Sequence, residues 1–334
     1  MATFDTVLPA DSIEFCPTHT DMFVCGTYHL QPATKKRTGQ CLVFRVKDGT
    51  TLENIQSIHL PAIPDMKWCH RPQDAPLLGI ADSEGHISLH QWKESKLESH
   101  SSISCASSDV LCLSLDWSNR LNASSDASIV ASLSDGSLCL LRPSEGAPSG
   151  LVLSDKWAAH DFEPWIAAWD YWNASTIYSG GDDLKLKMWD TRQGFDQPVL
   201  TNKRFDAGVT TIQSSPHSEH LVAVGSYDEK VRIFDKRQLL SPISEINVGG
   251  GVWRIKWHPS ATRRNDILVA CMHDGFKVVR LGVTGDGGDI IKRFDQHESL
   301  AYGADWSFAD SANGNDTLIA SCSFYDHSLH LWSG

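Results

Sequence analysis

Two side chains suited to acid–base or nucleophilic chemistry stand close together in the segment ACMHDGFKV, residues 270–278. His273 is a candidate general base because histidine titrates near physiological pH. Cys271, two residues earlier, would point to the same side of an extended strand and is a candidate nucleophile. The competing interpretations are a turn histidine bonded to neighbouring backbone and a buried structural cysteine.

No general catalytic or cofactor motif accompanies these residues. The sequence contains no G-x-S-x-G, H-E-x-x-H, Walker or dinucleotide-binding loop and no cluster with metal-ligand spacing. The glycine triplet at 249–251 precedes a strand-like segment rather than a helix, so it does not suit a phosphate group. We therefore expect no cofactor and no metal, and general motifs alone indicate an interaction scaffold.

The elements that must position these residues form a repeat. SGGDDLKLKMWDTR (179–192) and VGSYDEKVRIFDKR (224–237) align Asp183 with Asp228, and they resemble the WD repeat. Equivalent positions, 45 to 52 residues apart, are Glu84, Asp135, Asp183, Asp228, Asp274 and Asp326, and a seventh unit is expected near Thr38. Because a propeller blade needs four short strands, the sequence predicts an all-β, seven-bladed WD-repeat β-propeller, a single domain over residues 1–334.

Closure of the ring can also be predicted. The last unit stops at SLHLWSG, its third strand, which would leave an exposed edge. The N-terminal segment Thr3 to Leu8 can supply the missing strand. Resemblance to WD repeats further suggests that the turn aspartates bond within their turns, that Trp189, Phe234 and Trp332 pack between blades, and that His160 and His297 pair with a turn aspartate.

Composition limits the partners and the compartment. A formal charge of −12 opposes nucleic-acid binding, which needs a basic stripe. No apolar run reaches the length of a membrane span, and the N-terminus lacks the basic start of a secretory signal. Nine cysteines without C-x-x-C spacing suggest reduced, buried thiols. We expect a cytoplasmic monomer with no membrane insertion.

Several segments go beyond what a WD repeat requires. They are PWIAAWDYW (164–172), YSGGDD (178–183), GVTTIQSSPH (208–217), GSYDE (225–229), GGGVWRIKWHP (249–259), ACMHDGFKV (270–278) and YGADWS (302–307). Together they resemble the diphthine methyl ester hydrolase family of WD-repeat proteins, densely from about Trp157 onward and only in blade layout before it. The resemblance implies hydrolysis of the methyl ester of diphthine methyl ester on translation elongation factor 2, giving diphthine and methanol in diphthamide biosynthesis.

This activity assigns further roles on one face of the propeller. In a WD propeller, the loop that enters each blade and the turn between its second and third strands share a face around the channel. The substrate-binding residues expected there are Asp161, Trp165, Tyr227, Trp253, Arg254 and Tyr302, besides His160, Asp228 and Asp274. Trp253 and Tyr302 would form an aromatic wall for the substrate's trimethylammonium group, with core packing as the alternative.

Ester hydrolysis also needs a base and donors for the developing oxyanion. His273 is the preferred base and Cys271 the candidate nucleophile. Gly249, Gly250 and Gly251 could present backbone N–H groups to the oxyanion, or could simply form a tight loop between blades.

Two other functions remain open from the sequence. Many propellers are not enzymes, so a noncatalytic WD-repeat adaptor for protein–protein interaction is the main alternative. Recognition of methylated lysine by an aromatic cage also suits the acidic charge, but it does not explain the family-like segments.

Overall fold

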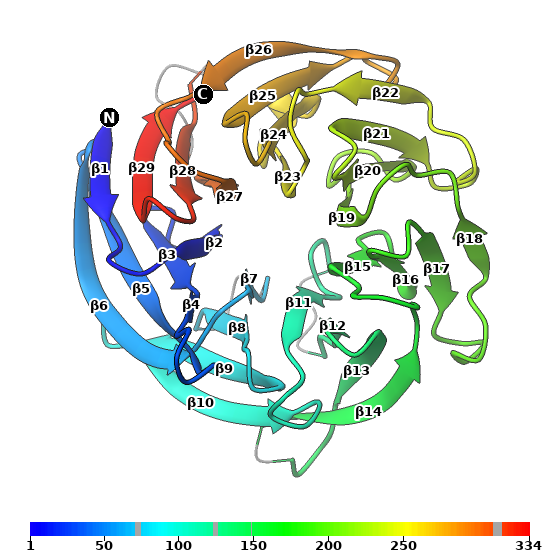
Figure 1. Ribbon diagram of the computed structural model, residues 1–334, viewed down its shortest axis with the longest axis horizontal. Helices are drawn as coiled ribbons and strands as arrows, with labels where there is room; N and C mark the ends of the chain where they lie inside the picture. The colour runs from blue at the N-terminus through cyan, green and yellow to red at the C-terminus, as the bar shows by residue number, and fades with distance from the viewer. Residues whose placement is uncertain (71–74, 123–125, 148, 310–315) are drawn as a thin grey trace.

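The computed structural model describes residues 1–70, 75–122, 126–147, 149–309 and 316–334. Its strands form seven antiparallel sheets arranged as blades around a central channel (Figure 1). The predicted seven-bladed β-propeller is confirmed. The only helix in the described ranges is a short 3-10 helix at Ala261–Arg263 in the sixth blade.

Each blade runs from an innermost to an outermost strand in chain order. Blade 1 has β2 (Ala10–Phe15), β3 (Met22–Thr27), β5 (Arg37–Lys47) and β6 (Thr51–Pro61), with the short β4 (His29–Leu30) also pairing with β5. Blade 2 has β7 (Asp65–Trp68), β8 (Leu77–Ala81), β9 (His86–Lys93) and β10 (Lys96–Ser104). Blade 3 has β11 (Cys112–Trp117), β12 (Ile129–Leu133), β13 (Ser137–Pro143) and β14 (Leu151–Ala158).

The second half of the chain repeats the plan. Blade 4 has β15 (Ile166–Asp170), β16 (Asn173–Gly180), β17 (Leu186–Asp190) and β18 (Leu200–Asn202). Blade 5 has β19 (Val209–Ser214), β20 (Leu221–Ser226), β21 (Lys230–Asp235) and β22 (Ser244–Asn247). Blade 6 has β23 (Arg254–Trp257), β24 (Asp266–Ala270), β25 (Phe276–Leu281) and β26 (Gly288–Phe294). Blade 7 has β27 (Ala301–Trp306), β28 (Leu318–Ser323) and β29 (Ser328–Ser333).

The N-terminus closes the ring as predicted, over a shorter segment than expected. β1 (Ala2–Asp5) pairs antiparallel with β29, and the two chain ends lie side by side (Figure 1). Beyond Asp5 the chain turns toward β2, because Val7 has a φ of 65° and its N–H donates to the Asp5 carboxylate. The closing strand is therefore Ala2–Asp5, which begins one residue before the expected range of Thr3 to Leu8 and ends three residues before its end.

Tryptophans at the ends of the innermost strands tie neighbouring blades together. Their indole N–H groups donate to backbone oxygens of the preceding blade's first strand: Trp68 to Glu14, Trp117 to Lys67, Trp257 to Gln213 and Trp306 to Lys256, at 2.9 to 3.2 Å. Buried side chains make the reciprocal contact. Asp65, Asp116 and Asp305 accept the backbone N–H of Leu115, Trp169 and Phe15 at 2.8 to 3.2 Å. Many of the 12 tryptophans thus have a structural role.

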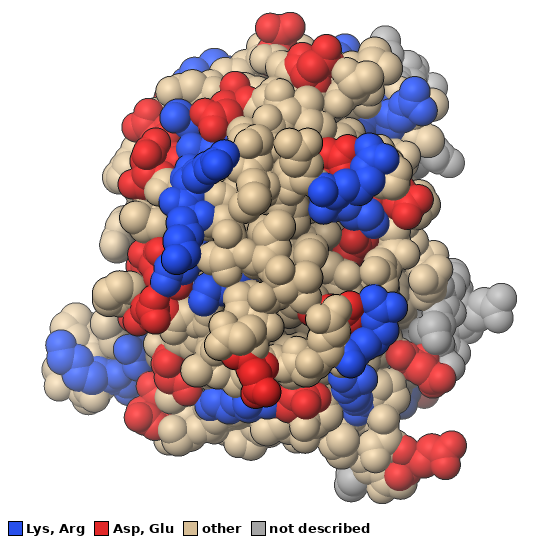
Figure 2. Space-filling view, turned by 90° about the vertical axis from the view of Figure 1, so that its right-hand side faces the viewer, with Lys and Arg blue, Asp and Glu red and all other residues tan. Residues whose placement is uncertain are grey.

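The outer surface carries no large patch of one charge in the view of Figure 2. There, around the side of blades 4 and 5, basic and acidic side chains are interspersed. Arg192 pairs with Asp190 at 2.7 Å and Arg237 with Asp235 at 2.5 Å. Among the described residues no helix is long and apolar enough to cross a membrane. All nine cysteines are buried, as predicted.

Deleting residues 2–5 is expected to destabilise the whole ring, because it removes a paired strand and the contact of Phe4 with Phe44 at 4.9 Å. We expect a loss of roughly 3 to 5 kcal/mol in the free energy of unfolding. Thr3→Ala is the control, since it removes only a side-chain bond to His330. Equal urea midpoints for the deletion and wild type would show that β1 does not close the ring.

Candidate functional site

One face of the ring gathers the residues that the sequence analysis selected. We term it the top face: it is formed by the loops entering the blades and by the turns between second and third strands. Backbone bonds join the two within a blade, for example Asp182 N–H to Glu163 O, Tyr227 N–H to Gly208 O and Phe324 N–H to Leu300 O, at 2.9 to 3.1 Å. These bonds fix the loops around the channel mouth.

His160 has a structural role on this face. Its Nδ1 lies 2.8 Å from Asp183 and its Nε2 lies 2.7 Å from the Ser179 hydroxyl, which also accepts the Trp189 indole N–H. Burial lowers the pKa of His160, although Asp183 opposes the shift. The expected pairing of His160 with the turn aspartate is confirmed. Asp161 is exposed and pairs with Lys185, away from the channel mouth.

His297 differs from the expectation. It contacts the hydroxyls of Ser323 and Ser321, and Ser323 in turn donates to Asp326. The serine is inserted between the histidine and the turn aspartate, so the pairing is indirect. Burial lowers the pKa of His297 to about 3, which keeps the ring neutral at physiological pH.

Four predicted substrate-binding residues come together at the channel mouth. Trp253 is central, with ring centroids 4.7 Å from Tyr302, 5.4 Å from Trp165 and 6.1 Å from Tyr227. Phe324 extends the cluster, 5.2 Å from Tyr302. We term these five rings the aromatic shelf. All are half-buried, so the shelf presents apolar, π-rich surface to solvent at the meeting point of blades 4 to 7.

Two carboxyl groups border the aromatic shelf. Asp182 accepts the Trp165 indole N–H at 2.8 Å, and burial raises its pKa. Asp11, the second residue of β2, is 7% exposed, and burial raises its pKa to about 7 despite the nearby guanidinium of Arg254 and indole N–H of Trp253. The Trp253 indole N–H lies close enough to Asp11 to lower the pKa of this carboxyl group. Neither Trp253 Nε1 nor Asp11 Oδ1 makes a well-formed hydrogen bond within the described residues.

Neither acid was predicted from the sequence, although a signal for Asp11 exists. An aromatic residue stands at or next to the end of four of the first strands: Phe15, Trp169, Trp257 and Trp306. Four residues before each of them stand Asp11, Trp165, Trp253 and Tyr302. The same strand position therefore places all four at the channel mouth. Of these four residues, only the three aromatic ones were predicted to bind substrate. Asp11 was not, because it lies in the part of the chain where the family resemblance is weak.

Below the mouth the channel is filled by alternating charges. Arg254 lies 3.3 Å from Asp65, Asp65 lies 2.6 Å from Lys67, and Lys67 lies 2.8 Å from Glu14. Glu14 also contacts Lys256 at 2.5 Å. Burial alone would raise the pKa of Glu14, but the two ammonium groups lower it to about 2. A cavity of about 20 Å³ lies beside Lys67, Arg254 and Lys256.

Arg254 is thus placed under the shelf rather than on it. It is 8% exposed, and its guanidinium is held by Asp65 and by the carbonyl oxygen of Pro64 at 3.5 Å. The positive charge of Arg254 nevertheless acts on a group at the channel mouth, since it lowers the pKa of Asp11.

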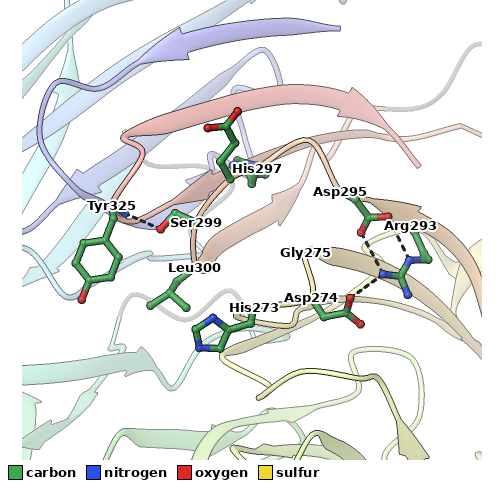
Figure 3. A pocket seen from close by; sticks show the side chains of 10 residues that line it. His273, Asp274, Gly275, Arg293, Asp295, His297, Ser299, Leu300 and Tyr325 are labelled. Carbon is green, nitrogen blue, oxygen red and sulfur yellow. Dashed lines mark hydrogen bonds and ion pairs between the residues drawn. The ribbon is translucent and has the colours of Figure 1, made fainter.

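His273 lies in a neighbouring pocket between blades 6 and 7, with a volume of about 540 Å³ (Figure 3). Arg293 bridges Asp274 and Asp295 at one end, and Tyr325 stands at the other. The His273 side chain is exposed, and no hydrogen bond orients it within the described ranges. A general base is usually oriented by such a bond, so the geometry gives His273 no support beyond its position.

Cys271 and the glycine triplet lie in packed regions. Cys271 is fully buried in the core between blades 5 and 6, and burial raises the pKa of its thiol to about 12. The structure separates it from the exposed His273 and disfavours a nucleophilic role. Side chains at Gly250 and Gly251 would collide with Cys271 O and Met272 Sδ, and Gly249 has a φ of 79°. Close loop packing therefore accounts for the triplet.

Several known proteins are similar to this chain over most of its length. A protein named diphthine methyltransferase from Mus musculus is 42% identical over 91% of this chain and 68% of its own length. The chain belongs to the diphthine methyltransferase family. A Dictyostelium discoideum homolog with that name is 36% identical over 97% of this chain and 96% of its own length. The protein from Schizosaccharomyces pombe is 33% identical over 97% and 94%.

Two further comparisons concern the fold. The family model "WD domain, G-beta repeat" matches residues 197–235, the region of blade 5. A chain of the structure named "Crystal Structure of Mitotic Checkpoint Complex" superposes with a TM-score of 0.74 at 13% identity, covering 100% of this chain and 91% of that one. This member of the diphthine methyltransferase family therefore shares its architecture with a chain of low sequence identity.

The charge network below the mouth makes Asp65 a sensitive position. Asp65→Asn should cost about 3 to 5 kcal/mol in the free energy of unfolding, because it leaves buried cations uncompensated. Asp155→Asn is the control, since its pair with Arg142 at 3.7 Å is on the surface and should change stability by less than about 1 kcal/mol. If the two variants lost equal free energy of unfolding in urea denaturation, the buried cations of the channel would not depend on Asp65 for compensation.

Proposed function

We propose that this protein removes the methyl ester from diphthine methyl ester on translation elongation factor 2, giving diphthine and methanol in diphthamide biosynthesis. Membership of the diphthine methyltransferase family supports the pathway. The observation that carries the proposal is the aromatic shelf with the buried Asp11 and the half-buried Asp182 beside it, because a trimethylammonium ion is attracted both by ring faces and by carboxylates.

Hydrolysis suits the chemistry of the channel mouth. The shelf would hold the cationic group, and the ester of the same modified side chain would then lie beside the shelf. Burial raises the pKa of Tyr227 and of Tyr302, so both phenols stay protonated and can donate a hydrogen bond to a developing oxyanion. Water is the only co-substrate required. Methyl transfer, which the relatives' name implies, would instead need a methyl donor.

A mass measurement separates these reactions. Elongation factor 2 bearing diphthine methyl ester is incubated with the purified protein alone, and the intact mass is recorded. We expect loss of the mass of one methylene at the modified histidine, together with one equivalent of methanol. A gain of that mass from diphthine and a methyl donor would establish a transferase. No change with verified substrate and folded protein would favour the noncatalytic adaptor.

The aromatic shelf gives a second prediction. Trp253→Ala should weaken binding of the cationic substrate by roughly 5- to 30-fold, whereas Trp253→Phe should retain most of it. Trp172→Ala is the matched control, because Trp172 is exposed on the opposite side of the ring, where its indole N–H donates to Ser215 O.

Small probes test the same shelf without the protein substrate. Choline should protect Trp253 fluorescence from a neutral quencher better than 3,3-dimethylbutanol, which has the same shape without the charge. Equal protection by the two probes would show that the shelf does not recognise the positive charge. Equal losses of substrate binding in Trp172→Ala and Trp253→Ala would also contradict a cation-binding role for the shelf.

A further inference from the structure

Asp11 is a buried carboxyl group at the channel mouth. The ion pairs below it join three cations (Arg254, Lys67 and Lys256) to three acids (Asp65, Glu14 and Asp305), with N–O distances of 2.5 to 3.6 Å. Arg120 and Asp116 also act on this network through their charges. Asp11 makes no ion pair among the described residues, and its Oδ1 has no hydrogen-bond partner. Arg254 lies near enough to act on Asp11 but is held by Asp65.

The groups that face Asp11 leave it in a poorly hydrated site. Around it lie Arg254 and Trp253 of blade 6, Asp65 of blade 2, and the phenols of Tyr28, Tyr227 and Tyr302, with the Cys25 thiol behind it. A charged carboxylate is costly in such surroundings unless a partner arrives. A carboxyl group kept in this state at a ligand site is typical of a functional residue.

We propose that Asp11 is the catalytic base of the proposed ester hydrolysis, accepting a proton from the water that attacks the ester carbonyl carbon. The inference rests on the proposed function. It assigns the base to the channel mouth, beside the shelf that would hold the cationic group of the same side chain. The exposed His273, in the neighbouring pocket, was the candidate from sequence.

The reaction balances with water alone. The water oxygen bonds to the carbonyl carbon as its proton passes to Asp11, and a tetrahedral oxyanion forms. When the carbon–methoxy bond breaks, the leaving oxygen takes the proton from Asp11 and departs as methanol. The product acid releases its own proton to solvent, and Asp11 is again a carboxylate. Binding of the substrate's cation would favour the ionised form of Asp11, which is the form a base requires.

Asp11→Asn, which keeps the shape of the side chain, should lower kcat/KM for methanol release by at least about 100-fold, with KM within a few-fold of wild type. Wild-type log kcat/KM should rise with unit slope up to about pH 7 and then level off, because the carboxylate form is active. The variant should lose this ionisation. Asp11→Glu should recover part of the rate.

Two other variants make the assignment specific. Asp295→Asn, which removes an exposed acid of the neighbouring pocket, should retain activity. His273→Ala should also stay within about threefold of wild type if Asp11 is the base. Wild-type turnover by folded Asp11→Asn, or a loss confined to His273→Ala, would overturn the proposal while leaving the hydrolase function intact. An inactive wild type with verified substrate would instead reject the proposed function.

A stability measurement is independent of activity. The pKa of Asp11 rises on folding from an ordinary 3.8 to about 7, so between these values the folded protein holds a proton that the unfolded chain has released. Wild-type stability should therefore fall through this pH range relative to Asp11→Asn. The two proteins should have similar melting temperatures near pH 4, and the variant should melt several degrees higher above pH 7. A variant that melts lower at pH 8 would show that Asp11 is a structural residue.

Discussion

The structure depends on the contacts between the innermost strands of neighbouring blades. Each blade must present a flat, narrow edge to the channel, and the blades must meet without leaving polar backbone unpaired. Strand-end tryptophans and buried acids meet both demands by bonding across the joints, as Trp306 does with Lys256 O and Asp305 with Phe15 N–H. β1 then closes the remaining edge on β29.

These contacts also determine what can lie at the channel mouth. In four of the first strands, an aromatic residue near the end is held by contacts with the neighbouring blade. The residue four positions earlier then lies at the channel mouth, on the top face. Asp11, Trp165, Trp253 and Tyr302 all have this position, although they come from blades 1, 4, 6 and 7. Rings as far apart in sequence as Trp165 and Phe324 thus form one shelf, in which the Trp253 ring centroid lies 4.7 Å from that of Tyr302 and 5.4 Å from that of Trp165.

The charges of the channel have a related consequence. Buried ion pairs contribute little net stability when complete but are costly when one member is missing. The ion pairs from Arg254 to Asp305 form one connected series. Asp11 stands just above this series, and its Oδ1 has no hydrogen-bond partner among the described residues. The mouth therefore combines apolar rings with an uncompensated acid, an arrangement that suits a positively charged ligand.

The sequence by itself determined the fold and much of the shelf. The 45- to 52-residue spacing of turn residues and the truncated last unit predicted seven blades and their closure, because repeats and strand alternation are local patterns. The same topology placed Trp165, Tyr227, Trp253 and Tyr302 on one face. Burial and pairing were decided only by the tertiary structure: Cys271 lies in a core, Asp161 pairs with Lys185, and Arg254 is held by Asp65. The surroundings of Asp11 arise in the same way: the hydration and the charged neighbours of its carboxyl group depend on residues from four other blades, which no local pattern contains.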